Sequence, residues 1–302
     1  MILSATVAAE QDGMRLDDGV KALFPDLSKG EIRRIIDRGG CAVNLVMVRV
    51  ASRLLKDGDK LDLGVMEPGR FVELACEKGD LLFEDNEFLA VNKAPGFNSQ
   101  RTPYQLKGTV EFAVGQYLKS IGSSEPARVV HRLDRGTSGV MFFPKTGKAA
   151  THISYQLKMG GVEKIYWALV ADIPEQESWE VDAPIAKISK FRYGVALPGK
   201  PARTLFRVMA TGSRAALVEC RPLTGRTHQI RVHLTHSGLP IVGDQPYGGT
   251  PAERMMLHCR TMAFRKRDGR PVAATAPVDP AFAAICREFG IDIDGLTPPD
   301  SP

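Results

Sequence analysis

The segment 131–139 reads His-Arg-Leu-Asp-Arg-Gly-Thr-Ser-Gly, and it holds the residues whose types and spacing are best suited to chemistry. It sets one carboxylate, Asp134, between Arg132 and Arg135 in a short polar loop punctuated by glycine. Two flanking guanidinium groups favour the ionised carboxylate, so we expect an oriented anion at neutral pH. Such a group suits nucleophilic or electrostatic work better than proton donation. The plain alternative is a loop acid that caps a turn and pairs with Arg135.

The elements around this loop are predicted to be rich in strands. The apolar run 140–143 is typical of a buried strand, so we expect Asp134 at the edge of a sheet with its loop facing a cleft. Similar runs predict further strands at 88–91, 165–170, 205–208 and 216–220. Helical patterns lie near 109–119, 146–158 and 278–289. Together they predict an α+β domain over residues 80–290 with a mixed, mostly antiparallel sheet.

A smaller domain is predicted over residues 13–64. Ser28 and Glu31 form a capping box, so a helix should begin there, and it should end at Gly39-Gly40. The helical period places three isoleucines on one face, namely Ile32, Ile35 and Ile36. Short strands should follow at 41–44 and 60–63.

Length and composition agree with two domains. The chain has 302 residues, of which 43% are hydrophobic and 25% charged, which is enough for a large core. Glu67-Pro68-Gly69-Arg70 predicts a linker over 65–79, and 291–302 is expected to be a flexible tail. No apolar run approaches the ~18 residues that span a bilayer, and residues 1–13 do not resemble a signal peptide. We therefore expect no membrane association and a cytoplasmic location.

Neither a metal site nor a disulfide framework is indicated. The five cysteines are odd in number and widely spaced, with no Cys-x-x-Cys pair. His228, His233 and His236 lack an acidic ligand at the spacing that metal sites use. The net charge of +5 is mild, but residues 221–270 hold nine Lys and Arg against three Asp and Glu. The basic bias therefore falls on this stretch.

The string at 131–139 is identified as the signature motif of RluA-type pseudouridine synthases. Three further segments resemble motifs of that family and follow in its order: 91–97, 163–170 and 223–234, the last continued by 238–247. Four ordered matches, over roughly residues 80–264, are far more specific than any one of them. Two features depart from the family pattern: Ala94 stands between Lys93 and Pro95, and the basic stretch 264–271 replaces an expected His-Pro.

The resemblance implies an isomerase that breaks the N1–C1′ bond of a uridine within RNA, turns the uracil, and joins its C5 to C1′. Because no net redox change or hydrolysis occurs, no cofactor is expected. Asp134 is implied to act at C1′, either by trapping the sugar covalently or by abstracting a sugar proton to give a glycal. Arg231 is implied to pair with Asp134, although spacing alone would make it an exposed cation on a helix.

Tyr166 is implied to stack on the target uracil. In its strand Tyr166 and Trp167 point to opposite faces, so one can face the cleft while the other packs in the core. By strand pattern alone, a core position for Tyr166 is equally expected.

Other residues are expected to bind the substrate or to support the loop. Reaching C1′ requires flipping the uridine out of its stack, and Arg132 resembles the family residue proposed to fill the vacated space. His131 is expected to brace the loop by hydrogen bonding, and Arg135 to lie beside the substrate. Arg226 is expected to contact phosphate groups. Lys93 is expected to shape the chain beneath the loop.

The pattern of residues 13–64 resembles the S4 RNA-binding module. The resemblance implies that four cations of the predicted helix grip RNA backbone, namely Lys29, Arg33, Arg34 and Arg38. Residues 1–70 hold eleven Lys and Arg against eleven Asp and Glu, so only a local patch is expected. A solvated helix face is the alternative.

The leading function is an RNA pseudouridine synthase that works as a monomer, with large-subunit ribosomal RNA as the expected substrate and transfer RNA as the alternative. Two other classes compete with it. One is a non-catalytic RNA-binding or ribosome-assembly protein that works through the S4-like domain. The other is a glycosidase-like hydrolase, which would need two facing carboxylates, with Asp244 as the candidate for the second.

Overall fold

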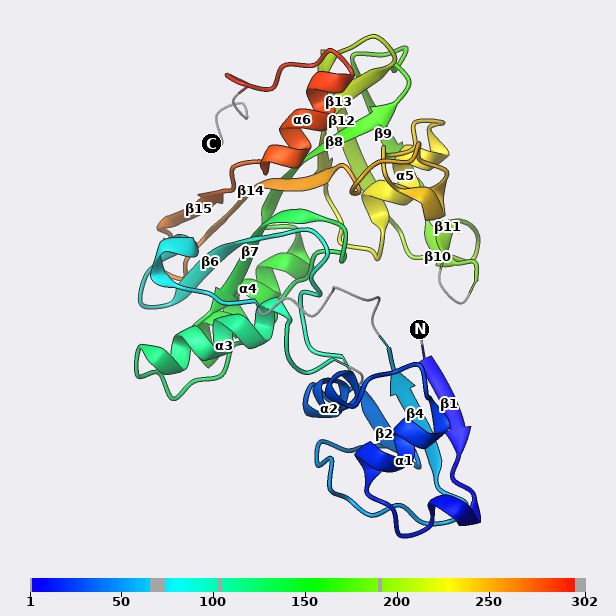
Figure 1. The fold of residues 1–302 in the computed structure, drawn as a ribbon. Helices are drawn as coiled ribbons and strands as arrows, with labels where there is room; N and C mark the ends of the chain where they lie inside the picture. The colour runs from blue at the N-terminus through cyan, green and yellow to red at the C-terminus, as the bar shows by residue number, and fades with distance from the viewer. Residues whose placement is uncertain (1, 66–73, 103–104, 190–191, 297–302) are drawn as a thin grey trace. The chain divides into compact units, whose positions relative to one another are not determined.

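The computed structural model describes residues 2–65, 74–102, 105–189 and 192–296. The chain divides into two compact units (Figure 1). The first unit holds Met1–Cys76 and Gln100–Ser124, and the second holds Glu77–Ser99 and Glu125–Pro302. Within the described ranges, no helix is both long enough and apolar enough to cross a membrane.

The first unit is built on a small antiparallel sheet with the strand order β1-β4-β2-β3. Its strands are β1 (Ile2–Thr6), β2 (Cys41–Val43), β3 (Val46–Met47) and β4 (Lys60–Gly64). Its helices are α1 (Leu16–Leu23), α2 (Lys29–Asp37) and α3 (Val110–Ser120), with a short 3₁₀ turn at Ala9–Gln11. The sheet thus begins at Ile2, ahead of the predicted start at residue 13.

Helix α2 has the predicted start and the predicted buried face. The Ser28 side chain accepts the N–H of Glu31, and the Glu31 carboxylate accepts the N–H of Ser28, which completes the capping box. The three isoleucines of α2 are buried in the core of the unit. Gly39 follows the helix with a φ of +76°, where a left-handed residue ends it.

The second unit is built on one large sheet with the strand order β5-β6-β7-β14-β8-β13-β12-β9 and β15 paired to β14. The strands are β5 (Leu81–Glu84), β6 (Phe88–Lys93), β7 (Ser138–Pro144), β8 (Glu163–Ala171), β9 (Ser178–Asp182), β12 (Arg203–Thr211), β13 (Ala215–Pro222), β14 (Leu257–Arg265) and β15 (Pro271–Thr275). Strands β7 and β14 run parallel, and the other pairs are antiparallel. The predicted α+β class with a mixed, mostly antiparallel sheet is confirmed.

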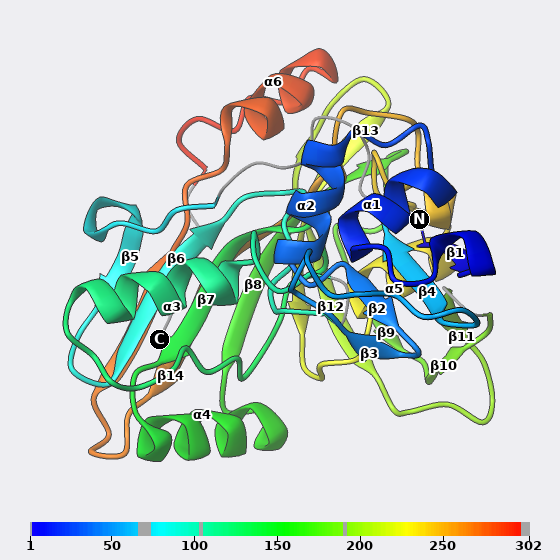
Figure 2. The ribbon, with the colours of Figure 1, turned by 60° about the horizontal axis from the view of Figure 1, so that its bottom comes forward.

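Three helices and a small hairpin complete the second unit (Figures 1 and 2). They are α4 (Gly147–Met159), α5 (Gln229–His236), α6 (Pro280–Glu288), and the strand pair β10 (Ile185–Lys187) and β11 (Tyr193–Val195). Short 3₁₀ turns lie at Lys78–Asp80 and Gln245–Tyr247. One core cluster packs residues of β8 and β13 with α5 and α6, and a second packs β6 and β7 with α4.

The chain stays packed beyond the predicted boundary at residue 290. Ile291 and Ile293 are buried and belong to the same core cluster as α6. Burial of these two isoleucines holds the segment on the core, although the residue between them is Asp292. The predicted linker motif at 67–70 and the last residues, 297–302, lie outside the described residues.

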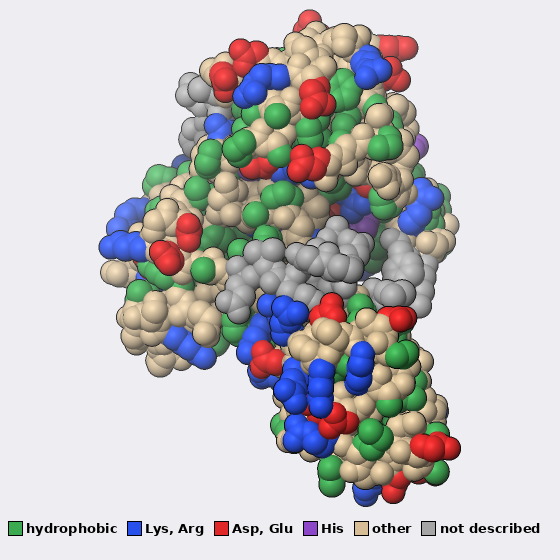
Figure 3. Space-filling view, in the orientation of Figure 1, with side chains coloured by type: hydrophobic (Ala, Val, Ile, Leu, Met, Phe, Trp, Pro, Cys, Tyr) green, Lys and Arg blue, Asp and Glu red, His purple; other side chains and the backbone are tan. Residues whose placement is uncertain are grey.

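Lys and Arg side chains lie side by side on the surface of the first unit (Figure 3). On α2, Lys29, Arg33 and Arg34 are exposed. Part of this charge is neutralised within the unit, because Lys29 pairs with Asp18 at 2.5 Å and Arg33 with Asp17 at 2.7 Å. Burial alone would raise the pKa of Asp17, but hydrogen bonds from Arg15 and Arg33 outweigh it, so this pKa lies below its usual value.

Candidate active site

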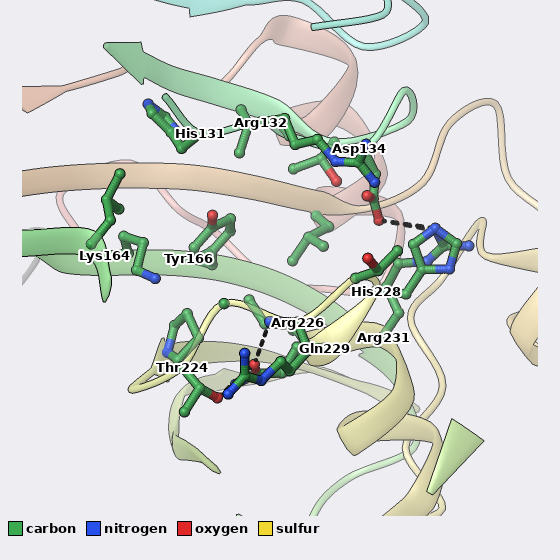
Figure 4. A pocket seen from close by; sticks show the side chains of 18 of the residues that line it. His131, Arg132, Asp134, Lys164, Tyr166, Thr224, Arg226, His228, Gln229 and Arg231 are labelled. Carbon is green, nitrogen blue, oxygen red and sulfur yellow. Dashed lines mark hydrogen bonds and ion pairs between the residues drawn. The ribbon is translucent and has the colours of Figure 1, made fainter. Parts of the chain in front are cut away.

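The loop with Asp134 opens a pocket at the amino end of β7 (Figure 4). Strand β7 is an interior strand, between β6 and β14, so the loop lies at the edge of the sheet where this strand begins, and it faces the pocket. The pocket has a volume of about 690 Å³. It is lined by 130–134, by Lys164 and Tyr166 of β8, and by 222–231.

A buried lysine holds this loop from below. Lys93, at the end of β6, donates from Nζ to the carbonyl oxygens of Ala94, Arg135 and Thr137, at 3.1, 3.2 and 2.6 Å. Burial lowers the pKa of Lys93 to about 7, with the Asp134 carboxylate opposing the shift. Three carbonyl acceptors compensate part of the desolvation of the amine, so Lys93 fixes the loop backbone as expected.

Two further contacts fix both sides of Asp134. The hydroxyl of Ser99 donates to the carbonyl of Leu133 at 2.6 Å and accepts the Leu133 N–H at 3.0 Å. Gly96 and Arg135 exchange two bonds: Gly96 N–H donates to the Arg135 carbonyl, and Arg135 Nε donates to the Gly96 carbonyl. The Arg135 guanidinium therefore braces the loop backbone.

The cation that pairs with Asp134 comes from 97 residues further along the chain. Arg231 Nη1 donates to Asp134 Oδ2 at 3.1 Å. The same guanidinium binds Asp244 through Nε and Nη2, at 2.7 and 2.8 Å. A planar guanidinium that is held by two bonds on one edge presents its remaining N–H in a fixed direction. The ion pair implied for Arg231 is thus present, with Asp244 behind it.

Asp244 cannot serve as a second carboxylate facing the substrate. Its side chain is 1% exposed, and both of its oxygens accept from Arg231. A hydrolase of the glycosidase type needs two carboxyl groups on opposite sides of the bond that breaks. The hydrolase hypothesis therefore loses Asp244, its candidate for the second carboxylate.

The segment before α5 is held by the side chain of Gln229. Its Oε1 accepts from Thr224 Oγ1 at 2.7 Å and from the Arg226 N–H at 2.9 Å. Its Nε2 donates to the Arg203 carbonyl and to Thr204 Oγ1. All four hydrogen-bonding positions are used, so the loop 223–228 is rigid where it lines the pocket.

Two residues that the sequence analysis did not assign to the site lie against Arg231 and Asp134. The ring of Tyr247 stacks under the Arg231 guanidinium, with 4.6 Å from Cζ to the ring centre. His228 Nε2 lies 3.7 Å from Asp134 Oδ2. The sequence signal for both was present, because 223–234 and 238–247 had been matched as one continuous motif.

The two aromatic residues of β8, Tyr166 and Trp167, lie on opposite faces of the strand, as neighbouring strand residues do. Tyr166 lines the pocket, whereas Trp167 is 1% exposed and packs in the core. Burial raises the pKa of Tyr166 well above its ordinary value, so its hydroxyl is protonated. Lys164 lies two residues before Tyr166 on the same strand face and also lines the pocket.

The remaining loop residues have distinct environments. His131 Nε2 accepts the Phe142 N–H at 2.9 Å, and burial lowers the pKa of His131 to about 4. A neutral ring that accepts a backbone N–H is a brace for the loop. Arg132 is exposed and lines the pocket. Arg226 also lines it, and its Nε donates to the Pro201 carbonyl at 2.8 Å.

Two other histidines are held inside the second unit. His233 contacts Thr204 Oγ1 and the Ala183 carbonyl, at 2.9 and 3.1 Å. His258 contacts Ser138 Oγ and the Ala276 carbonyl, at 2.8 and 3.2 Å. Among the residues that the structure describes, no cluster of His, Cys, Asp and Glu is arranged to hold a metal ion.

Comparison with known proteins identifies the class. The sequence profile of the RNA pseudouridylate synthase family matches residues 87–236. The chain is 36% identical over 253 residues to ribosomal large subunit pseudouridine synthase D of Yersinia pestis, covering 82% of this chain and 77% of that protein. The chain belongs to the RNA pseudouridine synthase family, and it is an isomerase of that class.

Particular relatives extend this result along the chain. Ribosomal large subunit pseudouridine synthase C of Yersinia pestis is 30% identical over 299 residues, covering 91% of both chains. Among solved structures, human RNA pseudouridylate synthase domain containing 4 shares the fold, with a TM-score of 0.62 and 21% identity. That alignment covers 71% of this chain and 94% of the human one.

Proposed function

We propose that this chain converts specific uridines of large-subunit ribosomal RNA to pseudouridine. The observation that carries the proposal is the Asp134 carboxylate, held by Arg231 at the mouth of a pocket that Tyr166 also lines. The substrate class is supported by the printed names of the relatives, two of which are ribosomal large subunit pseudouridine synthases.

Asp134 is the group that acts on the ribose of the target uridine. The N1–C1′ bond breaks, the uracil turns, and C5 joins C1′, while the C5 proton leaves to water and N1 gains a proton. Bond breaking builds positive charge at C1′, which an adjacent oriented carboxylate stabilises. Arg231 pairs with the Asp134 carboxylate and directs it. The proposed reaction uses no cofactor.

The other pocket residues hold the flipped nucleotide. Tyr166 stacks on the uracil, because its ring lines the pocket. Arg132 is exposed at the pocket rim, where it can fill the space that the uridine leaves in the RNA. His131 and Arg135 support the loop, and Arg226 contacts phosphate.

The first unit acts as an S4-type RNA-binding module. The proposed contacts to RNA backbone are four cations of the α2 region, namely Lys29, Arg33, Arg34 and Arg38. The support is the exposed basic surface of α2 together with its confirmed cap and buried face. Asp17 and Asp18 reduce the net charge of this surface. Contacts to phosphate groups contribute affinity without reading sequence. Monomeric state and cytoplasmic location stay predictions.

The test uses transcripts of large-subunit ribosomal RNA and of transfer RNA that carry tritium at uridine C5. Formation of pseudouridine releases that tritium to water. We expect release from the ribosomal transcript, and none when Asp134→Asn replaces the wild type. Release from transfer RNA alone would correct the substrate, and RNA binding without release from either transcript would contradict the proposed activity.

A further inference from the structure

A chain of hydrogen bonds fixes the ring of His228 beside Asp134. His228 Nδ1 lies 2.8 Å from the Tyr247 hydroxyl oxygen, which also accepts the backbone N–H of Tyr193 at 3.0 Å. Tyr247 is 4% exposed, and a buried hydroxyl proton needs an acceptor. In the described part of the chain that acceptor is His228 Nδ1, so the hydroxyl donates to it.

It follows that the proton of the neutral imidazole lies on Nε2, the nitrogen directed at Asp134. Burial lowers the pKa of His228 below its ordinary value, although the Asp134 carboxylate opposes the shift, so the ring is neutral at pH 7. Nε2 lies 3.7 Å from Asp134 Oδ2, the same oxygen that accepts Arg231 Nη1. That separation exceeds a hydrogen bond, and catalytic hydrogen bonds often tighten only when substrate binds.

The surroundings of His228 hold the ring in this direction. His228 stands at the start of α5 with a φ of 57° and a ψ of 20°, in the left-handed region. A non-glycine residue is strained in that region, and such strain concentrates at functional sites. The ring also meets Tyr193 and Tyr247 edge to face, at 5.5 and 5.6 Å between ring centres.

We propose that His228 is a positioning residue for Asp134. Its Nε2–H donates to Oδ2 of Asp134 in the substrate complex, so Arg231 and His228 together hold Oδ2, and Oδ1 is presented to the sugar. A neutral donor orients the carboxylate and leaves its negative charge available, whereas a second cation would neutralise that charge. This inference rests on the proposed function, because it requires that Asp134 acts on the ribose.

The test compares His228→Asn with His228→Gln and with Tyr247→Phe. Asparagine tolerates the left-handed backbone but is too short to reach Oδ2, whereas the glutamine amide can occupy the place of Nε2. Tyr247→Phe removes the donor that fixes the tautomer. The measurements are the single-turnover rate on the ribosomal transcript, the Kd for the same RNA, and the melting temperature. His236→Asn, an exposed histidine at the end of α5, is the matched control.

His228→Asn should lower the single-turnover rate about 10- to 100-fold, which is less than the loss of a donor that contacts the reacting atoms directly, because His228 acts through Asp134. The Kd should stay within about twofold of wild type. His228→Gln should recover part of the rate, Tyr247→Phe should lower it less than His228→Asn, and the control should match wild type.

Rates within twofold of wild type for both His228→Asn and Tyr247→Phe would overturn the inference and leave the proposed function standing. A loss explained by weaker RNA binding would also overturn it. If His228→Asn does not fold, Tyr247→Phe decides by the same criterion. A wild-type protein without activity on either RNA would instead overturn the proposed function and this inference with it.

Discussion

At the scale of single residues, the site depends on a buried carboxylate, Asp244, that does not face the pocket. Asp244 is buried and binds Arg231 by two hydrogen bonds, so it determines which N–H of Arg231 remains for Asp134. The sequence motif identified Asp134 and Arg231 but gave Asp244 no such role. Local spacing places Arg132 and Arg135 beside Asp134, whereas the guanidinium that pairs with it, Arg231, is distant in sequence. Local spacing cannot show which residues the folding of the sheet brings together.

Replacement of Asp244 by asparagine should therefore lower activity without weakening RNA binding. The amide keeps the size of the carboxylate but loses its charge and one acceptor, so Arg231 loses a fixed orientation. We expect a single-turnover rate about 10- to 100-fold below wild type. The free energy of unfolding should fall by about 3 kcal/mol, because the buried guanidinium loses one of its two carboxylate partners. Asp294→Asn, at an exposed position, should change neither quantity. A rate equal to wild type would show that Asp244 does not position Arg231.

At the scale of elements, the local signals in the sequence predicted the longer helices and the strands with continuous apolar runs, but not strands such as β1, β9 and β14. The capping box of Ser28 and the alternation around Tyr166 both predicted what the structure contains. The parallel pairing of β7 with β14 was not predictable, because the pairing of distant strands depends on sheet order. The three-residue strands β10 and β11 are too short to show a period.

The pairing of β7 with β14 depends on Gly139. Its φ is +112°, and a Cβ there would lie 2.1 Å from the backbone carbonyl oxygen of Cys259. Backbone on a buried strand cannot move away cheaply, so Gly139→Ala should destabilise the protein by more than about 2 kcal/mol. Gly147→Ala is the control, because a Cβ at this helical position meets nothing within 4 Å. It should change stability by at most about 1 kcal/mol, in the favourable direction. Urea unfolding of both variants measures the difference, and equal stabilities would contradict the account.

At the scale of the whole molecule, buried neutral histidines link stability to pH. His258 Nε2 can only donate to the Ala276 carbonyl, and in the neutral ring Nδ1 then accepts from the Ser138 hydroxyl. Burial lowers the pKa of His258 to about 4, against an ordinary value of 6.5. Between these two values the unfolded chain binds a proton that the folded chain does not. The free energy of unfolding therefore falls as the pH falls from about 6.5 to about 4.

The contribution of His258 is isolated by comparing wild type with His258→Gln. Each proton that only the unfolded chain binds steepens the pH dependence of the free energy of unfolding by up to about 1.4 kcal/mol per pH unit. Urea unfolding at pH 7, 6 and 5 should give a shallower pH dependence for His258→Gln than for the wild type. Carboxylates with lowered pKa values act equally on both proteins, so they cancel in the difference. Parallel pH profiles would show that His258 is not held neutral in the folded state.

The most direct test of the central claim is the fate of the target uracil. Wild type and Asp134→Asn are incubated with the ribosomal transcript, the RNA is digested to nucleosides, and pseudouridine and free uracil are quantified together. We predict pseudouridine equal to the uridine lost and no free uracil with the wild type, and neither product with Asp134→Asn. Pseudouridine formed at an undiminished rate by Asp134→Asn, or free uracil released by the wild type, would contradict the account.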